Sequence, residues 1–223
     1  MGLIRGHKKG ESWVVSSAAR YLRPGDAEAR EPAADGRRRR SQDSRARIVQ
    51  AMLDLVREGG VSPSAELVAA RADVGLRTVF RHFNDLDSLY REMSAVIESE
   101  LMSLVHTPFK GETWRERVLE LVERRGWAYE KIGPFKRASE VHRHQSPALA
   151  VDHAKMVQIS REILRQQLPA ELARDRVRFE AIDLLLSFDA WSRLRRDQDL
   201  SPKRATEVLQ AVISGLLDAS PED

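Results

Sequence analysis

Apolar residues recur at intervals of three and four along most of the chain, which is the spacing of one face of an α-helix. Ile48, Met52, Leu55 and Val56 show this spacing first, and no stretch of any length alternates apolar and polar residues as a strand does. The pattern therefore predicts an all-α chain, with helices at about 43–58, 65–71, 76–82, 86–105, 114–131, 135–144, 147–167, 172–196 and 202–218.

Residue types that favour helix ends stand at most of these boundaries. Ser and Thr before a helix can accept hydrogen bonds from its first free N–H groups, and Pro is well placed at a first helical position. On this basis we expect Asp43 or Ser41 to cap the first helix, and Gly59-Gly60 and Gly133-Pro134 to end helices. The remaining starts are expected at Ser64, at Asn84-Asp85, at a Thr113–Glu116 capping box, at Ser146-Pro147 and at Ser201-Pro202.

Two of the predicted helices are short and adjacent. Residues 65–71 and 76–82 are separated by a turn containing Asp73, one of the few non-glycine types that tolerate positive φ. Val74 would fill the angle between the two helices. This arrangement predicts a helix-turn-helix, whose second helix would present its N-terminal residues to base edges in the major groove of DNA.

The segment from Arg45 to Phe83 resembles the N-terminal DNA-binding domain of the TetR family of transcriptional regulators, in the family's order and spacing. The resemblance implies DNA contacts by the helix-turn-helix and the basic residues before it. Arg77 would pair with a guanine, Thr78 would contact a thymine methyl group or a phosphate, and Ser64, Arg81 and His82 would contact phosphates. Phe80 is open to two interpretations, a packing residue or a base contact. The full set of predicted DNA-binding residues is Arg37, Arg38, Arg39, Arg40, Arg45, Ser64, Gly75, Leu76, Arg77, Thr78, Phe80, Arg81 and His82.

The chain departs from the family pattern at four positions. Asp73 replaces the turn glycine, Gly75 replaces a Ser or Thr, Phe80 replaces a Tyr, and Leu86 replaces a Lys. The last two changes remove groups that would bond phosphates. Arg81 and the Arg37–Arg40 run are the candidates to compensate.

The distribution of charge agrees with a polyanionic partner. The net charge of the chain is +3, but residues 37–91 carry 11 basic and 7 acidic residues, while residues 92–223 carry 20 and 22. Residues 1–36 lack helical periodicity, and we expect residues 1–40 to be a disordered basic extension. The run Arg37–Arg40 is either a solvated charge run or an arm that contacts phosphates or the minor groove.

The later helices carry more apolar surface than one small core needs. In the family this half of the chain binds a small molecule and pairs the last two helices with their copies in a four-helix bundle, which implies a homodimer on a pseudo-palindromic operator. We therefore predict a DNA-binding domain at 41–101 and a ligand-binding and dimerisation domain at 102–223. The predicted dimer residues are Leu185, Phe188, Trp191, Leu209, Val212, Ile213 and Leu216. The predicted pocket residues are Trp114, Trp127, Tyr129, Phe135, His142, Met156 and Phe179.

Several classes of function find no support. The sequence has no cysteine, no phosphate loop, no nucleophile motif and no apolar run of about 18 residues, and His142 and His144 are too close in sequence to share a helix face. We expect a cytoplasmic, ligand-responsive regulator, most simply a repressor, that is not an enzyme, lies outside membranes and uses no cofactor or metal. Two alternatives remain: a protein-interaction module whose basic segment binds acidic partners, and an enzyme whose active site lies in the helical second half.

Overall fold

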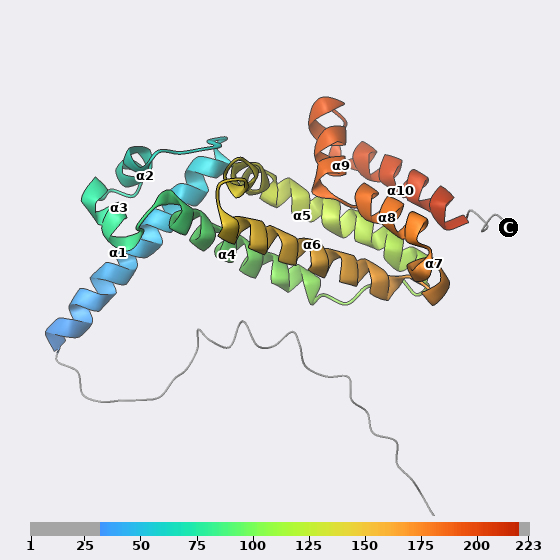
Figure 1. The fold of residues 1–223 in the computed structure, drawn as a ribbon, viewed down its shortest axis with the longest axis horizontal. Coiled ribbons are helices and arrows are strands. Elements are labelled where there is room, and N and C mark those ends of the chain that lie inside the picture. The colour runs from blue at the N-terminus through green and yellow to red at the C-terminus, as the bar shows by residue number, and fades with distance from the viewer. Residues whose placement is uncertain (1–31, 219–223) are drawn as a thin grey trace, which may run out of the picture. The chain divides into compact units, whose positions relative to one another are not determined.

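The computed structural model describes residues 32–218, with side chains described for all of these except residues 32–37 and 103–105. Every regular element among the described residues is helical, which confirms the all-α prediction (Figure 1). The elements are α1 (Pro32–Arg57), α2 (Ala65–Arg71), α3 (Leu76–His82), α4 (Leu86–Val105), α5 (Trp114–Arg143), α6 (Pro147–Gln167), α7 (Ala170–Arg174), α8 (Arg176–Leu185), α9 (Phe188–Ser192), the π-helical turn η2 (Arg193–Asp197) and α10 (Pro202–Asp218). None of these helices is long and apolar enough to cross a membrane.

The first helix begins earlier than predicted. It starts at Pro32 rather than near residue 43, so neither Asp43 nor Ser41 caps it, and the last part of the expected disordered extension is helical. Pro is well placed at a first helical position, and the Ala and Arg residues that follow have high helix propensity, which outweighs the single Gly36. The rest of that extension, residues 1–31, lies outside the described residues.

The helix-turn-helix forms at the predicted positions. The Ser64 hydroxyl accepts a hydrogen bond from the Leu67 N–H at 3.3 Å and caps α2. Asp73 takes the expected left-handed conformation, with a φ of 51°, which turns the chain into α3. Val79 and Phe83 face inward and pack with Ile48, Met52 and Val68 in one buried cluster. The packing of α3 on α1 and α2 therefore fixes which side of α3 remains exposed.

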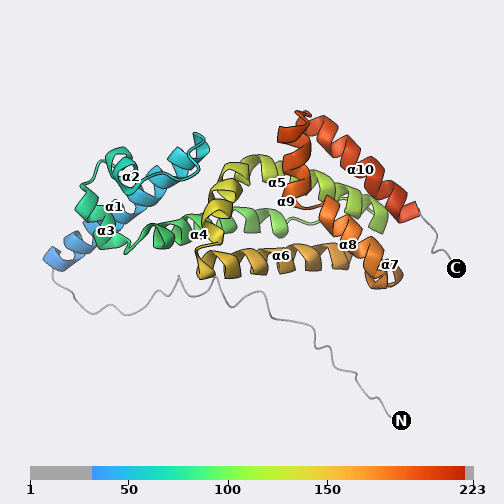
Figure 2. The ribbon, with the colours of Figure 1, turned by 45° about the horizontal axis from the view of Figure 1, so that its top comes forward.

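Helix α5 continues through the predicted break at Gly133-Pro134, so the two expected helices at 114–131 and 135–144 are one. Its start is as predicted, with Thr113 and Glu116 forming a capping box. Pro134 removes one backbone hydrogen bond. Ile132, Phe135 and Ala138, on both sides of the proline, are buried in the same cluster as α1 and α4, and this packing holds the helix together. The ribbon turns in its second half, as expected at an internal proline (Figure 2).

The helix predicted at 172–196 is wrong, because the chain forms α7, α8, α9 and η2 there. Two side chains make the interruptions. Asp175 accepts a hydrogen bond from the Arg178 N–H, and Ser187 accepts one from the Ala190 N–H, so each starts a new helix. Both residue types compete for backbone N–H groups, which the apolar periodicity of the segment does not reveal.

Because a new helix starts at Ser187, the Trp191 side chain points into a second hydrophobic core. This cluster joins the first half of α5 to α8, α9 and α10, and Trp191, Leu209 and Ile213 are 3%, 4% and 0% exposed in it. A Cβ at Gly126 would lie 2.7 Å from the Trp191 ring, so only glycine lets the helix approach it. Trp191, Leu209 and Ile213 are therefore withdrawn from the predicted dimer interface, since they are already buried within a single chain.

Candidate functional site

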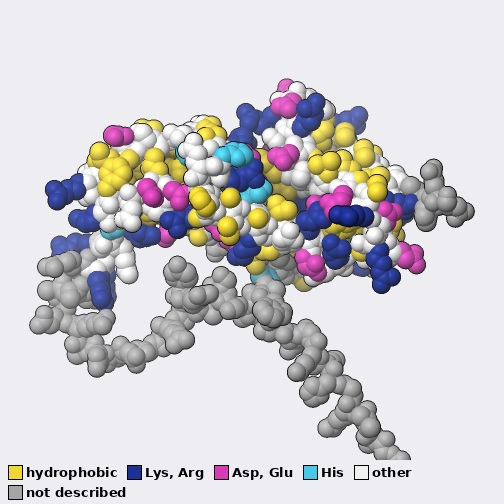
Figure 3. Space-filling view, in the orientation of Figure 1, with side chains coloured by type: hydrophobic (Ala, Val, Ile, Leu, Met, Phe, Trp, Pro, Cys, Tyr) yellow, Lys and Arg dark blue, Asp and Glu magenta, His cyan; other side chains and the backbone are white. Residues whose placement is uncertain are grey.

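Helix α3 has two distinct faces. Val79 and Phe83 are buried, while Leu76 is 37% exposed, Phe80 is 47% exposed, and Arg77 and Arg81 are exposed. At the left of the view in Figure 3, where Figure 1 places α2 and α3, dark blue Lys and Arg side chains lie beside yellow hydrophobic ones. Of the two interpretations of Phe80, packing is therefore the weaker one, because nearly half of its surface faces solvent.

The start of α3 is open to a close approach. Gly75 caps the helix without a side-chain hydrogen bond, and a Cβ placed there would meet nothing within 4 Å. Thr78 is partly exposed one turn further on. A recognition helix meets base edges through these first positions, so Gly75, Leu76, Arg77 and Thr78 form the part of the exposed face that a major groove would meet.

The side chains of two predicted DNA contacts, Arg45 and His82, face other residues of the protein. Arg45 donates hydrogen bonds to the His82 carbonyl oxygen at 2.9 Å and to the Glu92 carboxylate at 2.8 Å, and its guanidinium lies 4.4 Å from the centre of the Phe83 ring. It joins α1 to the end of α3 and to α4. These contacts indicate that Arg45 holds α3 in place, which is a different role from the DNA contact predicted for it.

His82 is the second of these. Its Nε2 is buried without a hydrogen-bond partner among the described residues, so this atom does not face a phosphate. Burial, followed by the charges of Arg81 and Arg45, lowers the pKa of His82 and favours the neutral imidazole. The phosphate contact predicted for His82 would therefore need an atom other than Nε2, and Arg81 is the exposed cation at this end of α3.

The remaining basic and polar candidates lie on exposed positions. Arg38, Arg39 and Arg40 are exposed on α1, and the side chain of Arg37 lies outside the described residues. Ser64 is exposed at the start of α2, where its hydroxyl accepts the capping bond from the Leu67 N–H. Their roles at DNA stay predictions.

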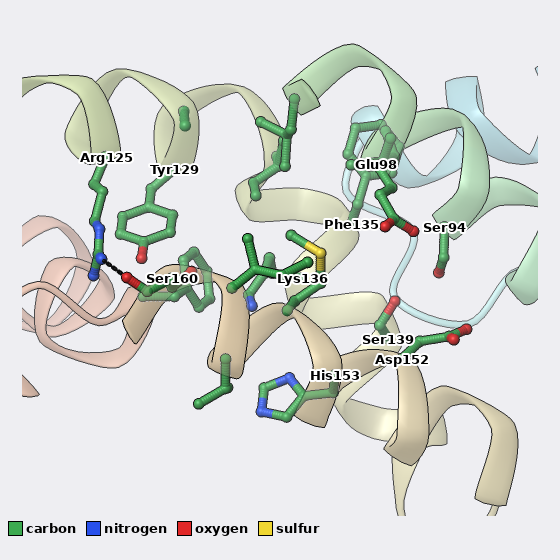
Figure 4. A pocket seen from close by; sticks show the side chains of 18 of the residues that line it. Ser94, Glu98, Arg125, Tyr129, Phe135, Lys136, Ser139, Asp152, His153 and Ser160 are labelled. Carbon is green, nitrogen blue, oxygen red and sulfur yellow. Dashed lines mark hydrogen bonds between the residues drawn. The ribbon is translucent and has the colours of Figure 1, made fainter. Parts of the chain in front are cut away.

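A cavity of about 500 Å³ lies among α4, α5, α6 and the segment from Asp183 to Asp189. This volume is in the range of small-molecule sites. Three of the seven predicted pocket residues line it, namely Tyr129, Phe135 and Met156. Figure 4 shows Tyr129 and Phe135 with polar side chains that the sequence interpretation had missed, Arg125, Lys136, Ser139, His153 and Ser160 among them.

The other four predicted pocket residues lie elsewhere. Trp114 packs against the second core, and Phe179 is buried within it. Trp127 is 52% exposed, with the Lys131 ammonium 4.3 Å from its ring centre. The His142 ring lies 4.1 Å from the ring of Tyr90 on α4. Aromatic character alone did not separate cavity walls from cores, because both use the same residue types.

The missed residues of α5 follow one line along the helix with the correctly predicted Tyr129. Arg125, Tyr129, Ile132, Lys136 and Ser139 recur every three or four residues and all line the cavity. Charged residues in line with apolar ones on a helix face would have been the signal, because a charge is costly in a dry core but tolerated beside a cavity.

Hydrogen bonds to backbone oxygens organise one end of the cavity. The Arg125 guanidinium donates to the Ser160 carbonyl at 2.7 Å and to the Leu186 carbonyl at 3.1 Å (Figure 4 shows the first). The Tyr129 hydroxyl donates to the same Leu186 oxygen at 2.9 Å, and burial raises the pKa of Tyr129. These bonds join α5 to α6 and to the end of α8 at this end of the cavity.

The other end of the cavity lies next to α1 and α4, the helices that pack against α3. Phe135 lines the cavity, and the Arg57 guanidinium at the end of α1 lies 5.4 Å from its ring centre. The Tyr90 hydroxyl donates a hydrogen bond to the Val61 carbonyl at 3.3 Å, and its ring lies on His142. Helix α4 itself contributes Met93 and Ile97 to the cavity wall. Phe135 and the wall residues of α4 therefore join the cavity to α1 and α4.

Comparison with known proteins shows where this fold occurs. No protein-family model matches the chain, and no curated protein sequence matches it. Among solved structures, a transcriptional regulator from Rhodococcus sp. Rha1 is 21% identical and is covered over 100% of its length by 80% of this chain, with a TM-score of 0.63.

Two further solved structures agree with the first. A TetR-like transcriptional regulator from Rhodococcus sp. RHA1 is 15% identical, with coverage of 79% of this chain and 97% of that one and a TM-score of 0.60. The multidrug binding protein EbrR, complexed with imidazole, is 21% identical, with coverage of 80% and 92% and a TM-score of 0.58. Together with the helix-turn-helix and the helices behind it, these similarities show that the chain has the fold of the TetR-like transcriptional regulators.

Proposed function

We propose that the chain is a cytoplasmic, sequence-specific DNA-binding regulator, and that α3 is its recognition helix. The observation that carries the proposal is the exposed face of α3, where Leu76, Arg77, Phe80 and Arg81 stand over a buried side formed by Val79 and Phe83. Arg on such a helix pairs with guanine, and exposed apolar side chains contact thymine methyl groups. The printed descriptions of the similar structures, which are transcriptional regulators, support the same function.

The cavity supports a response to a small molecule, and the neighbour EbrR is described as a multidrug binding protein. In the proposed mechanism, a ligand in the cavity favours one of two arrangements of α1 and α4, through Phe135 and Arg57 and through the α4 residues in the wall. Operator affinity differs between the two arrangements, and the ligand shifts their populations. We propose a repressor that the ligand releases from its operator.

The test of DNA binding uses the complete chain and a short duplex from the DNA upstream of its own gene. Fluorescence anisotropy is expected to show specific binding whose affinity falls roughly a thousandfold or more between about 50 and 200 mM salt, as expected for six or more phosphate contacts. A scrambled duplex of the same composition serves as the control. An affinity that is equal for both duplexes at every salt concentration would contradict sequence-specific regulation and favour a general acidic partner.

We also propose a homodimer formed through α8 and α10, which would set two copies of α3 against a pseudo-palindromic site. Since Trp191, Leu209 and Ile213 are buried within one chain, the proposed interface consists of the apolar side chains of α8 and α10 that are exposed. These are Val177 at 81%, Leu184 at 66% and Val212 at 47%. Leu185 and Leu216 are partly buried and remain candidates at its edge, whereas Phe188, which was also predicted for the interface, lines the cavity.

A charge placed on this face is expected to prevent pairing, because burying an unpaired carboxylate is costly. Leu184→Glu should therefore convert a dimer to a monomer in light scattering coupled to size exclusion. Val151→Glu is the matched control, since Val151 is 67% exposed on α6 and stands outside α8 and α10. A Leu184→Glu variant with the mass of the unchanged dimer would place the interface elsewhere.

A further inference from the structure

Lys136 is an unusual residue in the wall of the cavity. It comes from the second half of α5 and extends among the cavity side chains in Figure 4. Its side chain makes no hydrogen bond or ion pair with the residues that the structure describes, and its nearest aromatic contact, from Nζ to the centre of the Phe188 ring, is 5.7 Å. Burial lowers its pKa, against the opposing effects of Asp189 and Glu140. A bound group that accepts a hydrogen bond from this ammonium would therefore stabilise its charged form.

The carboxylates around the cavity do not supply that acceptor. Glu98 pairs with Lys155 at 3.4 Å, Asp183 pairs with Arg161 at 2.7 Å, and Glu140 pairs with Arg143. Asp152 and Asp189 also line the cavity, but both are exposed to solvent. Each acid is thus already paired or already solvated, whereas the partly buried Lys136 side chain lines the cavity without an ion pair among the described residues.

Apart from these charged residues and the arginines of the wall, the cavity is lined by apolar and neutral side chains. Met93, Ile97, Leu149 and Met156 line the cavity with Phe135. His153 faces the same space in Figure 4, and burial and the charge of Lys136 lower its pKa, which favours a neutral ring with one N–H to donate. A ligand that satisfies this wall has an apolar body and one acidic group.

We propose that the cavity selects an organic anion with an apolar body, whose carboxylate forms an ion pair with Lys136. This inference rests on the proposed function, in which the same cavity is the sensor site. The ligand is thereby restricted to amphipathic acids, as opposed to the neutral or cationic apolar molecules that the volume of the cavity would also admit.

Three probes of equal chain length test the charge preference: decanoate, decanol and decyltrimethylammonium. Calorimetric titration of the complete chain without DNA is expected to show decanoate binding about tenfold or more tightly than decanol, the effect of one hydrogen-bonded charge, and the cation binding most weakly. Equal affinities for decanoate and decanol, or a preference for the cation, would overturn the proposal.

Variants at Lys136 assign the preference to this side chain. Lys136→Met keeps much of the volume and removes the charge, so decanoate should lose about tenfold or more in affinity while decanol keeps its own. Lys136→Arg should keep the preference. Lys131→Met is the control, because Lys131 is an exposed lysine of the same helix that contacts Trp127 outside the cavity wall. Lys136→Met with unchanged selectivity would reject the assignment.

The pH dependence gives a second readout. Decanoate is already ionised at neutral pH, so its affinity should fall as pH rises through the lowered pKa of Lys136 and the ammonium is lost. The affinity of decanol should not change in that range. These titrations contain no DNA, so the ligand preference can be measured even if the chain does not bind its operator. If the ligand preference is absent, the DNA-binding proposal is not affected.

Discussion

The double variant Arg77→Ala/Arg81→Ala is expected to bind its operator at least about 100-fold more weakly than the unchanged chain at moderate salt. Arg77 stands in the first turn of α3, where a bidentate contact to a guanine is worth about 1–3 kcal/mol. Arg81 is exposed in the last turn of α3, and its loss should remove one phosphate contact and reduce the salt slope by about one. Fluorescence anisotropy with the specific and scrambled duplexes, at several salt concentrations, measures both effects.

The two single variants should differ in kind. Arg77→Ala is expected to bring the affinities of the two duplexes closer together, whereas Arg81→Ala should weaken both alike, because base contacts specify and phosphate contacts position. Arg204→Ala is the control of equal charge, since Arg204 is exposed on α10 and pairs only with Glu207 at 3.1 Å among the described residues. Operator binding that survives the double variant would move the recognition surface away from α3.

Trp191→Ala is expected to lower the free energy of unfolding by about 3–5 kcal/mol, the usual cost of removing a buried aromatic side chain. Trp191 is 3% exposed, its ring fills the space over Gly126, and its indole N–H donates to the Glu130 carboxylate at 2.8 Å. The variant therefore loses packing together with this link between α5 and α9, while the hydrogen bond from Arg195 of η2 to the same carboxylate, at 2.8 Å, remains. Urea unfolding followed by circular dichroism, at one fixed protein concentration, measures the change.

Trp127→Ala is the matched control, because Trp127 stands on α5 with 52% of its surface exposed and should change stability by only about 0.5 kcal/mol. The comparison separates a core residue from an interface residue. If Trp191 contributed mainly to pairing, the variant would keep the stability of the monomer and lose the dimer instead. Similar stability losses in the two tryptophan variants would therefore contradict the position of Trp191 in the second core.

Helix starts were predictable from the sequence wherever the cause is local. Ser64, the Thr113–Glu116 box and Ser146 each satisfy N–H groups only two or three residues away, so the residue types alone reveal them. Asp73 belongs with these residues, because the tolerance of a turn for positive φ is a property of the residue itself. The start of α1 was missed for the opposite reason, since a solvated basic run has no apolar periodicity to mark it as helical.

The candidate site was only partly predictable. Arg77 and Arg81, which were predicted to contact DNA, lie on the exposed face of α3, opposite the buried Val79 and Phe83. The role of Arg45 could not be predicted, because the sequence does not distinguish an arginine that points to a phosphate from one that points to Glu92. In the second half of the chain, only Tyr129, Phe135 and Met156 of the predicted pocket residues reach the cavity.

The sequence by itself determined the helical class, the helix-turn-helix and the capped ends, because periodicity and capping act within a few residues. Only the tertiary structure decided that α5 runs through Pro134, that the Trp191 side chain is buried in a core, and that Lys136 lines a cavity. Each of these depends on what lies on the other side of the helix. Buried packing can outweigh the roughly 3 kcal/mol that an internal proline costs, and a lysine beside a cavity can have the same sequence neighbours as one in solvent.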